Sequence, residues 1–147
     1  MQRDYFLNKA YCQFGIVSNT ISPNNISQKL GLFPDKSFNK GEESVSRHSG
    51  SILTKPHNLW AINSSTLVSE KENFSPHIKH LQSVLEAKIQ ILKDLKKDSE
   101  YELIFSFWIE TDNAGIGIDL SEEEVSFINS CSNRVHFSLL TTDEINE

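Results

Sequence analysis

The sequence predicts a single α+β domain over residues 1–147, with one mostly antiparallel sheet, helices packed on one face, and ferredoxin-like split βαβ halves. Three observations support this prediction. The length of 147 residues is typical of one domain. A hydrophobic content of 37% with nine phenylalanines is typical of a globular protein. Apolar residues recur every second position in some segments, as in strands, and every third or fourth position in others, as in helices. Along the chain these segments predict the order strand, helix, two strands, long helix, two strands, helix, strand.

The first strand and helix follow directly from local patterns. Residues 10–17, AYCQFGIV, alternate and include aromatic and β-branched residues, as a half-buried strand does. Ser22 is a helix-capping residue type, and Pro23 takes the preferred first helical position. Gly31 then predicts the end of this short helix.

Residues 35–58 are rich in Ser, Lys, Gly and Asn, and they predict a long loop. One short strand is expected near Val45. Residues 59–64, LWAINS, predict a further strand, and the two strands are expected to form a hairpin with a long connection.

The strongest helical pattern runs from Ser75 to Asp98. Ser75 is the expected cap and Pro76 the expected first helical residue. The apolar positions recur three or four residues apart, so the helix must lie on a core. They are Ile78, Leu81, Val84, Leu85, Ile89, Ile91, Leu92 and Leu95.

The last third of the chain predicts two strands, a helix and a strand. Residues 101–109, YELIFSFWI, are apolar on both faces and indicate a central strand, which a hairpin connects to a second strand around residues 116–118. Ser121 and Glu124 have the spacing of a capping box. Residues 134–140, RVHFSLL, alternate as a final strand.

The charge distribution disfavours nucleic-acid binding and suggests a protein partner. The net charge is -6, and residues 59–147 hold sixteen acidic against seven basic residues, which gives -9. Such acidity repels phosphate backbones, whereas it attracts a basic partner protein. The candidate partner-binding residues are Asp112, Asp119, Glu122, Glu123 and Asp143. The alternative is that the acidity only maintains solubility.

A second candidate site lies in the predicted loop. Lys40, Arg47 and His48 are placed there with Gly41 and would suit a small anion or a phosphorylated ligand. The segment lacks the spacing of a phosphate-binding P-loop, so a solvated basic loop is the competing interpretation.

No metal, cofactor or catalytic centre is indicated. His77 and His80 lack a third ligand at a suitable spacing, and two exposed histidines are expected. Cys12 and Cys131 form no CxxC pair, and Cys12 is expected to be a reduced thiol on a buried strand face. Neither lies in a motif for an activated nucleophile, so catalysis is not expected. No run of eighteen apolar residues predicts a membrane span, and the N-terminus lacks a signal peptide, so a cytoplasmic location is expected.

Several segments together resemble a bacterial family known as domain of unknown function 4279. They are ISPNNISQKLGLFP at residues 21–34, KGE at residues 40–42, Arg47, LWAINS, the long helix, and GIGIDLSEEE at residues 115–124. The resemblance covers about residues 10–140 and leaves a loose tail at 141–147. It implies a small cytoplasmic α+β domain, and it implies no enzymatic activity because none is established for the family.

The sequence therefore predicts a non-enzymatic, cytoplasmic protein-binding domain. Its most concrete version is an immunity or antitoxin-like protein that binds a basic partner such as a toxin, by analogy with other small acidic proteins. The alternative is a ligand-binding protein or minor enzyme that uses Lys40, Arg47 and His48.

Overall fold

A five-stranded mixed sheet forms the centre of the protein. The computed structural model describes residues 9–112 and 116–141. The sheet has the order β2-β5-β1-β6-β7. Its strands are β1 (Lys9–Ser18), β2 (Lys36–Phe38), β5 (Asn58–Asn63), β6 (Glu102–Thr111) and β7 (Arg134–Thr141). Only β6 and β7 pair in parallel, which confirms the mostly antiparallel sheet.

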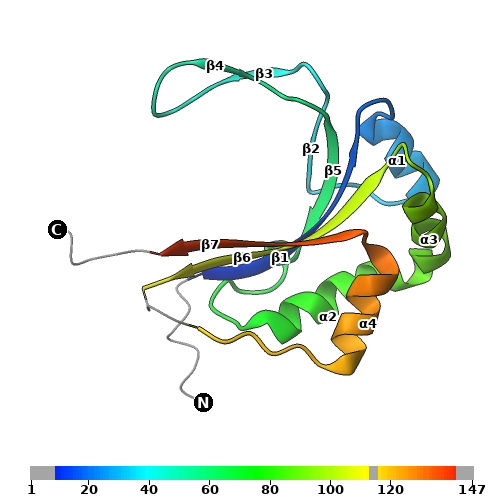
Figure 1. The fold of residues 1–147 in the computed structure, drawn as a ribbon, viewed down its shortest axis with the longest axis vertical. Coiled ribbons are helices and arrows are strands. Elements are labelled where there is room, and N and C mark those ends of the chain that lie inside the picture. The colour runs from blue at the N-terminus through cyan, green and yellow to red at the C-terminus, as the bar shows by residue number, and fades with distance from the viewer. Residues whose placement is uncertain (1–8, 113–115, 142–147) are drawn as a thin grey trace.

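The helices cover one face of this sheet, as predicted (Figure 1). They are α1 (Pro23–Leu30), α2 (Phe74–Leu85), α3 (Ile89–Lys97) and α4 (Glu122–Cys131). Ser22 caps α1 by accepting a hydrogen bond from the Asn25 N–H, and Gly31 ends it with a φ of 69°, a conformation that glycine adopts without a steric penalty.

The core lies between the sheet and the helices. Alternate residues of β1 and β6 point into it, and the apolar stripe of α2 and α3 closes it from the other side. The largest side chains with less than 2% exposure include Trp60, Phe14, Phe105 and Phe107. Burial of these large apolar surfaces provides the main driving force for folding.

The two halves of the chain differ in topology. In the first half, β5 lies between β1 and β2 and is antiparallel to both, so β1, α1 and β2 form a split βαβ unit. In the second half, β6 and β7 are adjacent and parallel, and α4 connects them without an inserted strand. The strand expected around residues 116–118 is absent from the described residues 116–120, which have no regular secondary structure.

The long helix is interrupted, which the apolar pattern did not predict. α2 ends at Leu85, a 3₁₀ turn η3 (Glu86–Lys88) follows, and α3 continues from Ile89. The expected cap was also wrong: α2 begins at Phe74 after Asn73, so Ser75 lies within its first turn. α2 packs against β1, whereas α3 packs against α4 and β6, so the two segments serve different parts of the core.

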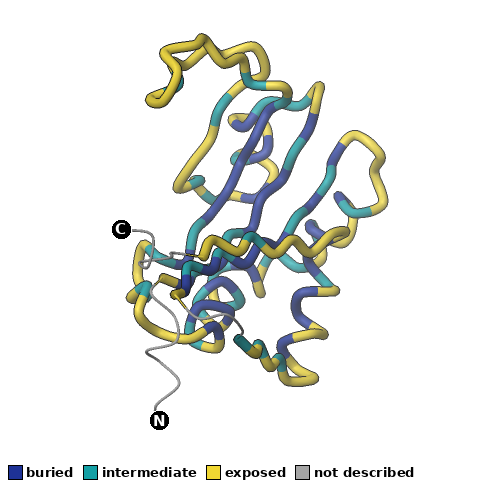
Figure 2. The backbone as a smooth tube through the Cα atoms, turned by 60° about the vertical axis from the view of Figure 1, so that its left-hand side comes forward, coloured by how far each residue is buried: buried dark blue, intermediate teal, exposed yellow. Residues whose placement is uncertain are grey.

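The segment between α1 and β5 contains more strand than expected. β2 pairs with β5, and a separate hairpin is formed by β3 (Glu43–Val45) and β4 (Ile52–Thr54). The strand at Val45 is confirmed, but it pairs with β4 and not with residues 59–64. The hairpin projects from the body of the protein and is exposed along its length (Figures 1 and 2).

No helix within the described ranges combines the length and the apolar character that crossing a membrane requires.

Candidate functional site

An open groove with a volume of about 480 Å³ lies in the helical layer, between the end of α2 and α4. Its walls come from α2, η3 and the start of α3 on one side and from α4 on the other. The lining residues are Gln82, Glu86, Ile89, Glu122, Glu123, Ser126, Phe127 and Ser130. Phe127 is only 7% exposed and packs edge-on against Phe105 of the sheet, so the bottom of the groove is part of the core.

Three carboxylates give the groove its acidic character. Glu122 and Glu123 lie in the first turn of α4, where the helix dipole favours negative charge, and Glu86 faces them from η3. Across residues 9–112 and 116–141, none of these three carboxylates has an ion-pair or hydrogen-bond partner. The groove therefore offers unpaired negative charge beside the apolar side chains of Ile89 and Phe127.

The neighbouring Glu124 has a structural role. Its Oε1 accepts the Ser121 N–H at 2.8 Å, while the Glu124 N–H donates to the Ser121 hydroxyl at 3.1 Å, which confirms the predicted capping box. Its Oε2 accepts the Ser75 hydroxyl of α2 at 2.8 Å. Glu124 thus connects the first turn of α2 to α4.

The other acidic candidates do not line this groove. Asp112 follows the end of β6, and Asp119 is exposed in the segment before α4. Asp143 lies outside the described residues. Of the five predicted acidic residues, the structure therefore brings together Glu122 and Glu123.

Sequence reasoning missed Glu86 as a member of this group. It lies 36 positions before Glu122, within a segment that reads as continuous helix. The sequence shows only that Glu86 lies on the polar side of the predicted long helix. It does not show that α4 packs beside this position.

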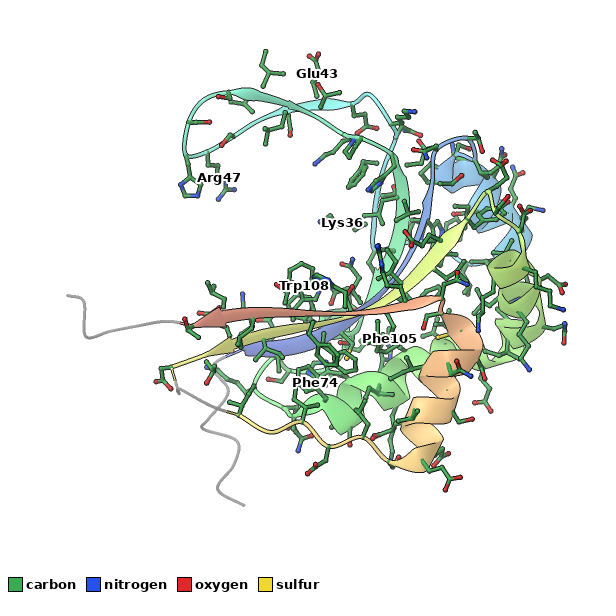
Figure 3. The ribbon with its side chains drawn as sticks, viewed as in Figure 1. Lys36, Glu43, Arg47, Phe74, Phe105 and Trp108 are labelled. Atoms are coloured by element: carbon green, nitrogen blue, oxygen red, sulfur yellow. The ribbon has the colours of Figure 1, made fainter. Side chains whose placement is uncertain are left out.

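The structure does not bring Lys40 together with Arg47 and His48. Lys40 lies at the base of the β3–β4 hairpin, where its N–H donates to Asn58 Oδ1 at 2.7 Å. Arg47 and His48 lie in the exposed connection at the tip, and Figure 3 shows Arg47 there. The strand β3 (Glu43–Val45) lies between them, so Lys40 is at one end of this arm of the hairpin and Arg47 and His48 are at the other.

The two histidines differ in environment. His77 is fully buried, so the expectation that both histidines would be exposed was wrong. Its Nδ1 lies 2.6 Å from Ser64 Oγ, its Nε2 lies 3.0 Å from the Ser69 carbonyl oxygen, and Ser64 Oγ accepts the Cys12 N–H. This chain of bonds fits a neutral imidazole that donates from Nε2. Burial lowers the pKa of His77, partly offset by the Ser69 hydrogen bond.

The two thiols are buried and free. Cys12 lies on the core face of β1, as predicted, and burial raises its pKa well above the ordinary value. Burial also raises the pKa of Cys131 to about 12. Thiolates at such positions are scarce at neutral pH, so neither cysteine has the properties of an activated nucleophile. Among the described residues, no three His, Cys, Asp or Glu side chains cluster closely enough to bind a metal ion.

Comparison with known proteins identifies the family of the chain. The model of the family described as Domain of unknown function (DUF4279) matches residues 8–142. No curated protein and no solved structure matches the chain. Since the family model covers nearly the whole chain, the protein belongs to the DUF4279 family.

Proposed function

We propose that this protein is a cytoplasmic protein-binding domain whose groove receives a basic segment of a partner protein. The observation that supports this proposal is the set of three carboxylates, Glu86, Glu122 and Glu123, which have no partner among the described residues and surround a groove with an apolar floor. Lysine and arginine side chains match this arrangement, because their charged ends pair with carboxylates while their aliphatic parts cover Ile89 and Phe127.

The electrostatic properties of the chain suit a basic partner. The net charge of -6 attracts a cationic protein over distances of about 8–10 Å at physiological salt and accelerates their encounter. The groove then adds direct ion pairs. Binding that depends on these pairs must weaken as the salt concentration rises.

The most concrete form of the proposal is an immunity or antitoxin-like protein in a bacterium. In this role the protein would bind a basic toxin and block it. A gene for a large toxin next to the gene for this protein would be expected, and co-expression of the two should remove the toxicity.

A capture experiment tests the proposal. The tagged protein is incubated with a lysate of its source organism, and the bound proteins are compared with those bound by the triple variant Glu86→Gln, Glu122→Gln, Glu123→Gln. The matched control neutralises three exposed carboxylates outside the groove, Glu43→Gln, Glu72→Gln and Asp94→Asn, so the net charge changes equally.

We expect the wild-type protein and the control to retain one basic partner at low salt and to release it as the salt concentration increases. The groove variant should lose about tenfold in affinity, because each lost ion pair at these exposed carboxylates contributes about 0.2–1 kcal/mol. Equal capture by the groove variant and the control would contradict the proposal, as would capture that does not depend on salt.

A further inference from the structure

We propose that two copies of this protein associate through the free edge of β7, so that the two β7 strands pair antiparallel and join the two sheets into one continuous mixed sheet. β7 pairs only with β6 among the described strands, and its other edge is open (Figure 1). In a parallel ladder, alternate residues direct their N–H and C=O groups toward the neighbour. The remaining main-chain groups of β7 point outward and are available to another strand.

β7 lacks the features that normally protect an edge strand. It is eight residues long, it contains no proline or lysine, and all but one of its residues are exposed (Figure 2). Its one formally charged residue, Arg134, lies at its start and is paired with Glu102 of β6 at 3.3 Å. The opposite edge of the sheet differs, because β2 has only three residues and begins with Lys36.

The exposed side chains of β7 are unusually apolar. Val135, Phe137 and Leu139 are 45%, 51% and 58% exposed and alternate on the face that carries the helices, where Phe137 stacks on Phe107 at 4.8 Å. Leu140, on the other face, is 59% exposed. An edge strand with exposed apolar side chains of this kind is a template for pairing with a further strand.

The occupant that these residues fit is a second copy of β7. A two-fold axis perpendicular to the sheet keeps every side chain on its own face and makes the two strands antiparallel. With this axis at Phe137, the residue lies opposite its own equivalent, and Val135 lies opposite Leu139 of the other copy. All three apolar side chains of the helix-bearing face then meet apolar partners. Shifting the axis to Ser138 instead places Val135 opposite Thr141.

The charge on β7 supports the antiparallel arrangement. In this arrangement the two copies of Arg134 lie at opposite ends of the interface, about 20 Å apart, whereas parallel pairing in register would place them side by side. Arg134 also keeps its partner Glu102, because both side chains lie on the face away from the helices. The acidic groove is not involved, since its lining residues belong to α2, η3, α3 and α4.

The interface is small, so the dimer should be weak. Each copy contributes one strand of eight residues, compared with about 20–30 residues per side in a standard interface. We therefore expect dissociation in the micromolar range. Sedimentation of the wild-type protein should show the average mass rising from one copy toward two as the concentration increases.

Two pairs of variants test the inference. Leu139→Lys places a charge opposite Val135 of the other copy and should weaken the dimer at least tenfold. Its control, Val45→Lys, alters a similarly exposed valine on the β3–β4 hairpin and should leave the association unchanged. In the second pair, Phe137→Cys should form an intermolecular disulfide under mild oxidation, because paired antiparallel residues have Cα atoms about 4.5–5.5 Å apart.

The control for the disulfide is Leu140→Cys, since the two copies of residue 140 would be about 20 Å apart. This control also shows that Cys12 and Cys131, which are both fully buried, do not react. A wild-type protein that stays monomeric up to millimolar concentration would overturn the inference. So would equal association of Leu139→Lys and Val45→Lys, or crosslinking of Leu140→Cys as efficient as that of Phe137→Cys.

Discussion

Replacing Glu124 by alanine should lower the free energy of unfolding by about 2–4 kcal/mol, a large effect for a single polar residue. Its side chain is 8% exposed and accepts two hydrogen bonds of 2.8 Å, one from the Ser121 N–H and one from the Ser75 hydroxyl. Hydrogen bonds to a charged group contribute about 1.5–3 kcal/mol each. The two bonds sum to about 3–6 kcal/mol, and the predicted loss is smaller than most of this range because Ser121 is exposed and water can replace one bond.

Urea unfolding followed by tryptophan fluorescence measures this effect, since Trp60 is fully buried and becomes exposed on unfolding. Ser75→Ala removes one of the two bonds and should cost about 1–2 kcal/mol. In the double variant, the effects of Ser75→Ala and Glu124→Ala should not add, because they remove the same contact.

Glu123→Gln is the matched control for Glu124→Ala. Glu123 lies in the same helical turn, is exposed, and has no partner within the described parts of the chain, so only its interaction with the helix dipole is lost, about 0.3–1 kcal/mol. A Glu124→Ala protein as stable as Glu123→Gln would refute the role assigned to Glu124 in joining α2 to α4.

Three further predictions concern the core. Burial lowers the pKa of His77 in the folded protein, so the unfolded chain takes up a proton on this residue at a higher pH, about 6.5, than the folded protein does. Stability should therefore decrease as the pH falls through about 6.5, by less than the limit of about 1.4 kcal/mol per pH unit that one full proton would give. Urea titrations of a His77→Gln variant should lack this component, and an unchanged slope would contradict the assignment. Cys12 and Cys131, both fully buried, should react with a thiol reagent only at the rate of unfolding, and rapid labelling of the native protein would be inconsistent with their burial. Trp60→Phe removes the 2.9 Å hydrogen bond to Ser27 and should cost about 1–2 kcal/mol in urea unfolding followed by circular dichroism, because this variant lacks the fluorescent reporter; no loss would show that this bond adds nothing.

Features encoded by neighbouring residues could be predicted from the sequence. The cap at Ser22, the glycine at position 31 and the capping box of Ser121 and Glu124 depend only on residues three or four positions apart. The alternating core face of β1 was equally visible, and Cys12 lies on it as expected. The structure confirms these local features, and with them the predicted α+β class.

Features that depend on tertiary packing could not be predicted in this way. Glu86, Ala87 and Lys88 are good helix formers, so nothing local indicates the 3₁₀ turn that they form. Ser75 has the residue type of a cap, but its hydroxyl bonds to Glu124, 49 positions later.

The candidate site likewise combines residues that local sequence patterns reveal with residues that only tertiary packing brings together. Glu122 and Glu123 were found because they are adjacent in a helix that could be recognised. Glu86 was not, since its proximity to them arises only when α4 packs beside α2 and α3. The basic candidates failed to converge because an unrecognised hairpin separates Lys40 from Arg47 and His48.

Hydrogen–deuterium exchange of the protein alone and with its captured basic partner tests the account most directly. If the groove is the binding surface, amide exchange should slow in residues 82–89 and 122–130, and the Glu86, Glu122 and Glu123 triple variant should show no such change at the same concentrations. Protection confined to the β3–β4 hairpin, with both groove segments unaffected, would contradict the account.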